Sequence, residues 1–402
     1  MKKYLIIIII LSSTVVYAQS GWYTQPISTN FNLLSASFIS TNTGWTTNGE
    51  FLYRTINGGN TWTNIAGVIG GISLFFADNM NGRATDGQFV GRTTNGGMNW
   101  TSVQVVVQGE LIRDVFFLSS QTGWASTDIG HIYKTVNGGL NWISQPTNTV
   151  NSLNSVFFLN NLSGWAVGSS GRIIKTTDGG TSWFSQSTFL PYFYNDVFFV
   201  SPNTGCIAGN DGILLTTDGG INWTFQYNSP SSNLVSICFA SQTTGWAAGE
   251  NGTIIKTSNG GVNWFQQNSN TNTDLRQIVF ISTSTGWAVG NNGIILKTSD
   301  GGGPIGIQHL SSEVPETFAL SQNYPNPFNP VTNIEFSVSK QGIVELIVYN
   351  ALGKQVAVVI NENLNTGTYR ADWDATEYPS GIYFYKLVTE DFVQTKKMIL
   401  IK

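Results

Sequence analysis

Two aspartates, Asp114 and Asp196, are the residues best placed for acid–base chemistry. A phrase of about 40 residues recurs along the chain, and each copy contains a Gly that is usually followed by Trp. Asp114 and Asp196 lie nine residues before that Gly, where the other copies have Ser35, Ser73, Ser155, Ser236 and Gln277. At the start of an innermost strand, two such carboxylates would face a shared channel and act as the acid and base of a glycoside hydrolase. The reading we favour is a polar hydrated rim in which Asp caps strand ends.

A second candidate site is an aromatic loop that immediately precedes Asp196. Segment 188–195 carries four aromatic side chains at a place expected to be exposed, and aromatic faces stack on sugars or anchor protein contacts. Two arginines that directly precede rim residues add hydrogen-bond donors. The predicted ligand-binding residues are Phe189, Tyr192, Phe193, Tyr194, Asp196, Asp114, Arg113 and Arg276. The alternative is that Tyr192 and Phe193 fold back onto the neighbouring units.

Other chemistries lack the residues they need. The only histidines are His131 and His309, and His131 is expected at the surface. The two cysteines, Cys206 and Cys238, lie in adjacent repeats and either pair or remain as buried small apolar residues. No helix follows the Gly pairs, so they are turns rather than phosphate loops. A net charge of −4 with no basic face argues against nucleic-acid binding. We expect no metal and no cofactor.

The phrase that positions these residues is V-x-F, a short turn, G-W-A-x-G, x-x-G-x-I-x-K-T and x-[DN]-G-G-x-x-W. A Phe lies six residues before the repeated Gly in all seven copies, and the glycines are Gly44, Gly82, Gly123, Gly164, Gly205, Gly245 and Gly286. Each unit has four short apolar segments separated by Gly, Asn and Asp, which predicts four strands joined by tight turns. This period is typical of a β-propeller blade, so we predict an all-β fold with a seven-bladed propeller over 19–303.

The two ends of the repeat array predict how the ring closes. Six units end in a Trp, whereas the seventh stops at Gly302 without one. Residues 21–25 precede the first unit and resemble 182–186, which contain the final Trp of the fourth unit. We therefore expect an N-terminal strand to supply the missing outer strand of the last blade, which pairs both open edges of the array.

The turn between the third and fourth segments resembles the Asp-box of sialidase-type repeats. Its copies read Thr-x-[Asp/Asn]-x-Gly-x-x-Trp, as in Thr176 to Trp183. The Asp or Asn can bond backbone N–H groups of its own turn, and Gly takes the positive-φ position. With the G-W-A-x-G phrase added, units 21–303 look like those of photosystem II assembly factors, and the resemblance implies a propeller fold.

Sialidase chemistry is not expected despite the Asp-boxes. It needs three arginines on the substrate carboxylate, a Tyr nucleophile and acidic partners, and the propeller has few arginines. Two of these, Arg54 and Arg92, occupy the position at which other repeats have Lys134 or Lys175, so we expect them to be solvated outer-strand charges.

Composition changes after Asp300. Segment 304–317 is rich in Gly, Ser and Pro and is predicted to be a linker. Alternating apolar runs between Ile334 and Ile401 then predict a small Ig-like β-sandwich over 318–402.

This C-terminal segment resembles a known class of export domain. Residues 323–330 read Asn-Tyr-Pro-Asn-Pro-Phe-Asn-Pro, in which Pro bars regular strand pairing. This segment and the phrases at 348–354, 379–385 and 396–402 are similar to blocks of the C-terminal sorting domains of type IX secretion cargo. The resemblance implies that the type IX secretion machinery carries the chain across the outer membrane, followed by release or surface attachment. The alternative is a generic Ig-like accessory module.

The first residues are typical of a signal peptide. Lys2 and Lys3 precede the short apolar run 5–11, and Val16-Tyr17-Ala18 offers a cleavage site. We therefore assign 1–18 to a signal peptide and expect Sec export to the periplasm. No later stretch is long and apolar enough to predict a membrane span in the mature chain.

Three functions remain open. The first, which we favour, is a non-catalytic propeller on the cell surface or outside the cell that binds a glycan or a surface protein. The second is a secreted glycoside hydrolase or lyase that uses Asp114 and Asp196 at the channel mouth. The third is a structural or adhesive surface protein.

Overall fold

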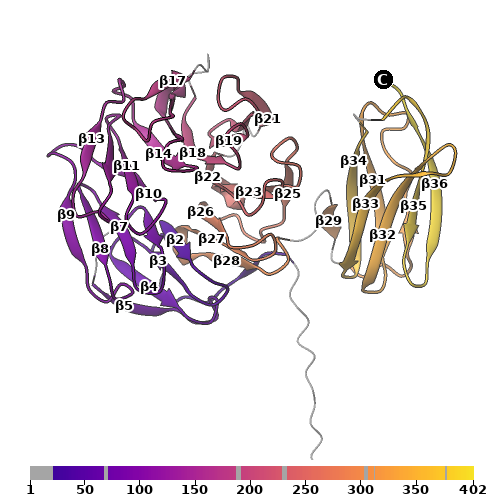
Figure 1. Ribbon diagram of the computed structural model, residues 1–402. Helices are drawn as coiled ribbons and strands as arrows, with labels where there is room; N and C mark the ends of the chain where they lie inside the picture. Colours follow the sequence, from indigo (N-terminus) through magenta and orange to yellow (C-terminus); the bar gives the residue numbers. More distant parts are fainter. Residues whose placement is uncertain are drawn as a thin grey trace, which may run out of the picture.

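The computed structural model describes residues 21–67, 71–186, 192–228, 233–302, 307–311, 313–375 and 378–402. Short 3-10 turns are the only helical segments in these ranges, and the rest of the regular structure is strand. Between Tyr23 and Thr298 the described strands form seven four-stranded antiparallel sheets that follow one another around a ring (Figure 1). The all-β propeller predicted from the repeat is therefore confirmed. None of the described helical segments is long and apolar enough to cross a membrane.

Each sheet, here called a blade, begins with the strand that lies nearest the central channel and contacts the equivalent strands of both neighbours. Blades 1 and 2 are β2 (Ser35–Phe38), β3 (Gly44–Thr47), β4 (Phe51–Thr55), β5 (Thr63–Gly67), and β6 (Leu74–Phe76), β7 (Gly82–Asp86), β8 (Phe89–Thr93), β9 (Thr101–Gln104). Blades 3 and 4 are β10 (Ile112–Phe117), β11 (Gly123–Thr127), β12 (Ile132–Thr135), β13 (Ile143–Gln145), and β14 (Leu153–Phe158), β15 (Gly164–Gly168), β16 (Ile173–Thr176), β17 (Phe184–Gln186). Blades 5 and 6 are β18 (Tyr194–Phe199), β19 (Gly205–Gly209), β20 (Gly212–Thr216), β21 (Thr224–Asn228), and β22 (Leu234–Phe239), β23 (Gly245–Gly249), β24 (Ile254–Thr257), β25 (Phe265–Gln267). Blade 7 is β26 (Leu275–Phe280), β27 (Gly286–Gly290), β28 (Ile295–Thr298) and the N-terminal β1 (Tyr23–Thr24).

The N-terminal strand closes the ring. β1 pairs antiparallel with β28, with Tyr23 opposite Lys297. The backbone N–H of Gly21 donates to Oδ2 of Asp300 at 2.9 Å, so the start of the propeller is bonded to its last Asp-box turn. Both edges that an open array would expose are thereby paired.

Stacking of a Trp on a Phe joins neighbouring blades at five of the seven junctions and explains the repeated Trp and Phe. The Trp124 indole of blade 3 stacks on Phe158 of blade 4 with ring centroids 3.5 Å apart. Phe158 in turn meets the edge of Trp183, the Asp-box Trp of its own blade, at 5.7 Å. A Cβ on Gly164 would come within 2.5 Å of the Phe158 ring, so only Gly fits at the position that opens the G-W pair.

The Lys at the repeated position connects neighbouring blades through a hydrogen bond. The sequence predicted a solvated charge on an outer strand at this position, and that prediction is wrong. Lys134 lies on the third strand of its blade, with Nζ 5.3 Å from the ring centroid of Trp124. It donates to the carbonyl oxygen of Gly179 in the next blade at 2.9 Å, and Trp124 Nε1 donates to the same oxygen at 3.4 Å. Arg54 lies in the same way over Trp45 in blade 1.

Two blades replace the Trp of the G-W pair. In blade 2 the residue is Arg83, which is 3% exposed and donates from Nε to the carbonyl oxygen of Gly138, the bond that an indole N–H makes in other blades. In blade 5 it is Cys206, which is 1% exposed. Cys206 and Cys238 are both free thiols.

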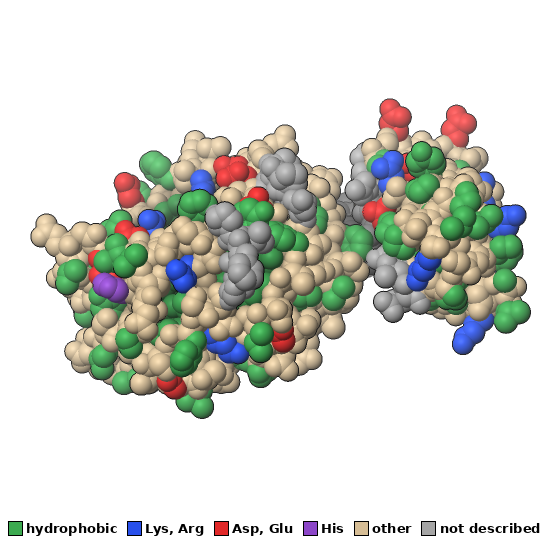
Figure 2. Space-filling model, turned by 90° about the horizontal axis from the view of Figure 1, so that it is seen from above, with side chains coloured by type: hydrophobic (Ala, Val, Ile, Leu, Met, Phe, Trp, Pro, Cys, Tyr) green, Lys and Arg blue, Asp and Glu red, His purple; other side chains and the backbone are tan. Residues whose placement is uncertain are grey.

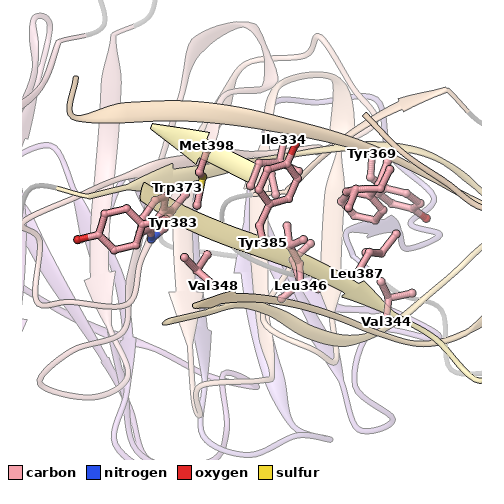
Figure 3. Packing of buried hydrophobic residues seen from close by; sticks show 14 of the residues in the cluster. Ile334, Val344, Leu346, Val348, Tyr369, Trp373, Tyr383, Tyr385, Leu387 and Met398 are labelled. Carbon is pink, nitrogen blue, oxygen red and sulfur yellow. The ribbon is translucent and has the colours of Figure 1, made fainter. Parts of the chain in front are cut away.

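The C-terminal residues fold as two four-stranded antiparallel sheets around one apolar core (Figure 3). The first sheet has the order β29 (Ile307–Ser311), β34 (Gly367–Asp374), β31 (Val331–Val338), β30 (Ala319–Leu320), and the second β33 (Gln355–Leu364), β32 (Gly342–Asn350), β35 (Gly381–Val388), β36 (Val393–Leu400). The sequence assigned 304–317 to a linker, but Ile307–Ser311 pairs with β34. This strand was missed because the Gly, Ser and Pro residues around it are typical of a linker.

The irregular segment 323–330 is fixed by side-chain hydrogen bonds. Asn323 is 2% exposed, its backbone N–H donates to the Tyr385 hydroxyl at 2.8 Å, and its Nδ2 donates to Thr332 Oγ1 at 2.9 Å. Tyr385 lies inside the core that Figure 3 shows, and burial raises its pKa to about 12. Asn323 therefore anchors the first residues of the domain to both of its sheets.

Candidate binding face at the channel mouth

Five blades have a β-bulge at the start of the innermost strand. The register shifts between Ile112 and Asp114 in blade 3 and between Tyr194 and Asp196 in blade 5. The bulged residues are Arg113, Asn154, Asn195, Val235 and Arg276. A bulge bends its strand and re-aims side chains, which is how the innermost strands present both a bulged residue and the polar residue that follows it.

The polar residues that lie nine positions before the repeated Gly form a hydrogen-bonded belt around the channel. In six of the seven repeats the side chain accepts a hydrogen bond from a backbone N–H of the next blade's innermost strand. The bonds are Leu74 N to Ser35 (3.0 Å), Val115 N to Ser73 (3.4 Å), Val156 N to Asp114 (3.1 Å), Ile237 N to Asp196 (2.8 Å), Ile278 N to Ser236 (3.3 Å) and Ala36 N to Gln277 (2.6 Å). Edge-strand N–H groups that would otherwise face the channel are satisfied in this way.

Asp114 and Asp196 lie in this belt and are linked through Ser155. Asp114 accepts from the Ser73 hydroxyl at 3.0 Å, and Asp196 accepts from the Ser155 hydroxyl at 2.9 Å. Burial raises the pKa of both carboxyl groups, and the nearby Asp114 contributes to a pKa of about 7 for Asp196. The oxygens of each carboxylate therefore accept hydrogen bonds from the two neighbouring blades. Because its pKa is raised, each carboxyl group also holds a proton more tightly than a solvated Asp does.

The aromatic loop is only partly exposed. Phe193 is 55% exposed, whereas Tyr194 is 2% exposed and belongs to the core between blades 4 and 5. Tyr192 is half-buried and packs edge-on against Phe225 with centroids 5.6 Å apart. Phe189 lies outside the described residues. Of the predicted aromatic site, the structure therefore presents Phe193 with the Tyr192–Phe225 pair.

Hydrogen bonds on both sides hold the Phe193 backbone in place. The N–H of Phe193 donates to Asn210 Oδ1 at 3.0 Å, and the carbonyl oxygen of Phe193 accepts from Asn210 N at 3.1 Å. The carbonyl oxygen of Tyr192 accepts from Gly171 N at 2.6 Å. A side chain displayed on a fixed backbone loses little conformational entropy on binding, which suits a recognition loop.

The two predicted arginines differ in their surroundings. Arg113 is exposed, whereas Arg276 is half-buried and donates from Nε to Asn291 Oδ1 at 3.0 Å. Both occupy bulge positions at the start of an innermost strand. No group of three or more His, Cys, Asp or Glu side chains in the described ranges is arranged to hold a metal ion.

The sequence did not single out Glu110, which is 1% exposed. Its carboxylate lies 3.0 Å from Nδ1 of His131 and accepts from the Tyr133 hydroxyl at 3.1 Å. Burial and this carboxylate raise the pKa of Tyr133 to about 12. Glu110 belongs to a connecting loop outside the repeated phrase, so no repeat position marked it.

Comparisons with known proteins agree with this architecture. Residues 145–229 and 220–320 match the family described as photosynthesis system II assembly factor YCF48, and residues 322–402 match the secretion system C-terminal sorting domain. A comparison with curated proteins found no match.

Solved structures show the same propeller fold at low sequence identity. The structure described as YCF48 bound to D1 peptide is 21% identical, covering 70% of this chain and 98% of that chain with a TM-score of 0.60. YCF48 from Cyanidioschyzon merolae is 20% identical, covering 69% and 98% with a TM-score of 0.56. The GH74 enzyme of Niastella koreensis is 12% identical, covering 95% and 75% with a TM-score of 0.56.

The sorting domain indicates export to the cell surface or the extracellular space. The chain is a β-propeller with Asp-box turns that is similar over residues 145–320 to the photosystem II assembly factor family, and it carries a C-terminal type IX secretion sorting domain.

Proposed function

We propose that the exported propeller is a non-catalytic binding module that recognises a glycan or a surface protein at its channel mouth. The observation that carries the proposal is the use of Asp114 and Asp196 in the belt between blades. Each carboxylate accepts a backbone N–H of the next blade together with a Ser hydroxyl, so both serve to hold the ring together. The exposed Phe193, the Tyr192–Phe225 pair and Arg113 supply the contacts that a bound partner would use.

The relatives support both a binding and an enzymatic use of this fold. One neighbour is described as bound to a peptide, and another is described as a GH74 enzyme. At these identities the likeness concerns the fold, and function depends on the residues at the site.

A glycoside hydrolase or lyase is the second candidate, and one observation favours it. Burial raises the pKa of Asp196 to about 7, in the range of a general acid that works near neutral pH. In that case Asp196 would donate the proton and Asp114 would act as the base.

The test is an array of polysaccharides, glycans and outer-membrane proteins probed with the full mature chain, followed by an assay for released sugars. We expect saturable binding without products, and we expect Phe193→Ala to weaken that binding at least fivefold. Phe184→Ala is the matched control, because Phe184 is a 57% exposed Phe on the outer strand β17. Release of products that is lost in both Asp114→Asn and Asp196→Asn would establish the enzyme instead. A blank array would leave an adhesive or structural surface protein as the better account.

We also propose that the type IX secretion machinery acts on residues 318–402. A chain that ends at residue 317 should fold its propeller and remain in the periplasm, whereas the full chain reaches the surface. Equal surface exposure of the two forms, measured by protease accessibility on intact cells, would contradict this proposal.

A further inference from the structure

A polar groove lies between blades 3 and 4, lined by residues of the outer strand β13 and of the 3-10 turn region of blade 4. Its volume is about 510 Å³, within the roughly 300–1,000 Å³ typical of small-ligand sites. Ser144 and Gln145 line it from β13, Asn148 and Asn151 from the connecting loop, and His131 and Arg172 from the two blades on either side. We propose that this groove binds a sugar acid, with a carboxylate on Arg172 and a ring hydroxyl on His131.

Arg172 is a guanidinium without an acidic partner. Nη1 donates to the Ser185 hydroxyl at 3.1 Å and Nη2 to Asn151 Oδ1 at 3.4 Å, so both bonds go to neutral oxygens. Nε of Arg172 is buried without a hydrogen-bond partner in the described residues, and no carboxylate there lies within ion-pair distance of this side chain. A half-buried, uncompensated guanidinium is suited to a carboxylate of a ligand, which it can bind through the Nη hydrogens that Ser185 and Asn151 leave unused.

His131 supplies a different kind of contact. The buried Glu110 carboxylate lies 3.0 Å from Nδ1, which fixes the ring and places the Nδ1 proton on the side of the acid. Nε2 is then the nitrogen that remains for the groove, into which the 44% exposed His131 side chain opens. In the neutral ring this nitrogen accepts a hydrogen bond, so it matches a hydroxyl rather than a second carboxylate.

The groove wall is built before any ligand binds. Thr147 is 5% exposed and donates from Oγ1 to the carbonyl oxygen of Gly130 at 2.6 Å, which fastens the connecting loop to blade 3. Asn148 adopts a left-handed conformation with φ of 56°, and the Asn151 N–H donates to Thr149 Oγ1 at 3.2 Å. Amide and hydroxyl groups held in this way suit the hydroxyl pattern of a saccharide.

Another loop of the propeller has the same conformation as the groove loop at one Asn but lacks residues equivalent to His131 and Arg172. The loop between blades 6 and 7 also has an Asn in the left-handed conformation, Asn270, with φ of 57°. There Thr253 and Ile294 occupy the repeat positions of His131 and Arg172. Because the same fold accepts Thr and Ile at these positions, His131→Thr and Arg172→Ile are substitutions that the blade architecture tolerates.

The test is the binding of tetragalacturonate and of an alginate tetramer to the full mature chain by isothermal titration calorimetry, with the methyl-esterified tetragalacturonate as the neutral probe. We expect at least one acidic tetramer to bind, at least tenfold weaker binding for Arg172→Ile and for the ester, and a several-fold loss for His131→Thr. Arg370→Ala removes a guanidinium on β34 of the C-terminal domain, outside the propeller, so it is the control and should bind as the wild type does.

Failure of both tetramers to bind, or equal affinity of the ester and the acid, would overturn the proposal. Unchanged affinity in Arg172→Ile would overturn it as well, even if a sugar acid bound elsewhere. The groove does not depend on the channel-mouth proposal, because Phe193→Ala tests that surface and should leave tetramer binding unchanged. Circular dichroism and thermal unfolding of each variant separate lost binding from lost folding.

Discussion

Trp22 meets the Phe280 ring edge-on with centroids 5.6 Å apart, in the relationship that Trp183 has with Phe158 in blade 4. A residue that precedes the whole repeat array therefore completes its last blade. The Trp22 indole is 1% exposed and donates to Gln267 Oε1 at 3.1 Å.

Trp22→Ala should lower the free energy of unfolding by about 3–5 kcal/mol, because a buried indole and its hydrogen bond are lost together. Urea denaturation followed by fluorescence would measure the loss. Phe31→Ala removes a 58% exposed ring from the same N-terminal segment and should cost less than about 0.5 kcal/mol. Equal losses in the two variants would show that Trp22 does not close the ring.

Arg83→Trp should stabilise the protein by about 1 kcal/mol. Burial, together with the neighbouring Arg92, lowers the pKa of Arg83 to about 10, so its charge is held at a cost. Cζ of Arg83 lies 5.2 Å from the ring centroid of Phe117, and the Trp at the same position of other blades stacks on the equivalent Phe. The indole N–H would replace the Nε bond to Gly138. A higher Tm for Arg83→Trp and a lower Tm for Arg83→Ala are expected, and a lower Tm in both would contradict the prediction.

Asp196 should make the wild type lose stability as pH rises between about 4 and 7. Burial, with a contribution from Asp114, raises the folded-state pKa to about 7, whereas an unfolded Asp has a pKa of about 3.9. In that window the folded state holds a proton that the unfolded state has released, so the slope is negative and at most roughly 1.4 kcal/mol per pH unit.

Asp196→Asn should therefore have a flatter stability profile between pH 4 and 7, measured by urea denaturation at each pH. The control is Asp218→Asn. Hydrogen bonds from Asn222 lower the pKa of this exposed carboxyl to about 2, so its titration lies below the window. An unchanged slope in Asp196→Asn would indicate that the carboxyl is ionised throughout.

Cys206 and Cys238 should be unreactive in the folded protein. Burial raises the pKa of both thiols, which removes the nucleophilic thiolate. Titration with Ellman's reagent at pH 8 should find no accessible thiol in the native chain and two in urea. Finding none in urea would mean that the two residues form a disulfide in the isolated protein.

Most of the fold could be predicted from the repeated phrase in the sequence. The regular spacing of Phe158 and Gly164 predicted the propeller blades, and the Trp that the last unit lacks predicted the closing N-terminal strand, because these residues recur at fixed positions in each unit. The role of Lys134 was missed, since its partner is the backbone of another blade and periodicity within one unit does not reveal that contact.

The candidate sites were harder to predict for the same reason. The rim positions of Asp114 and Asp196 were found by counting, but their bonds to Val156 and Ile237 depend on how neighbouring blades pack. Tyr194 belongs to the core although it lies next to the exposed Phe193, because strand alternation begins inside the aromatic loop. On the face that Figure 2 shows, charged side chains are few and scattered and form no single charged patch that would mark a binding site.

The bond between Gly21 and Asp300 joins residues 279 positions apart in the chain. Such a contact forms only after nearly all of the ring has been synthesised and has folded around it. Contacts of this sequence separation make folding slow, so the first strand to leave the ribosome is the last to find its partner. Until then its backbone and Trp22 remain unpaired.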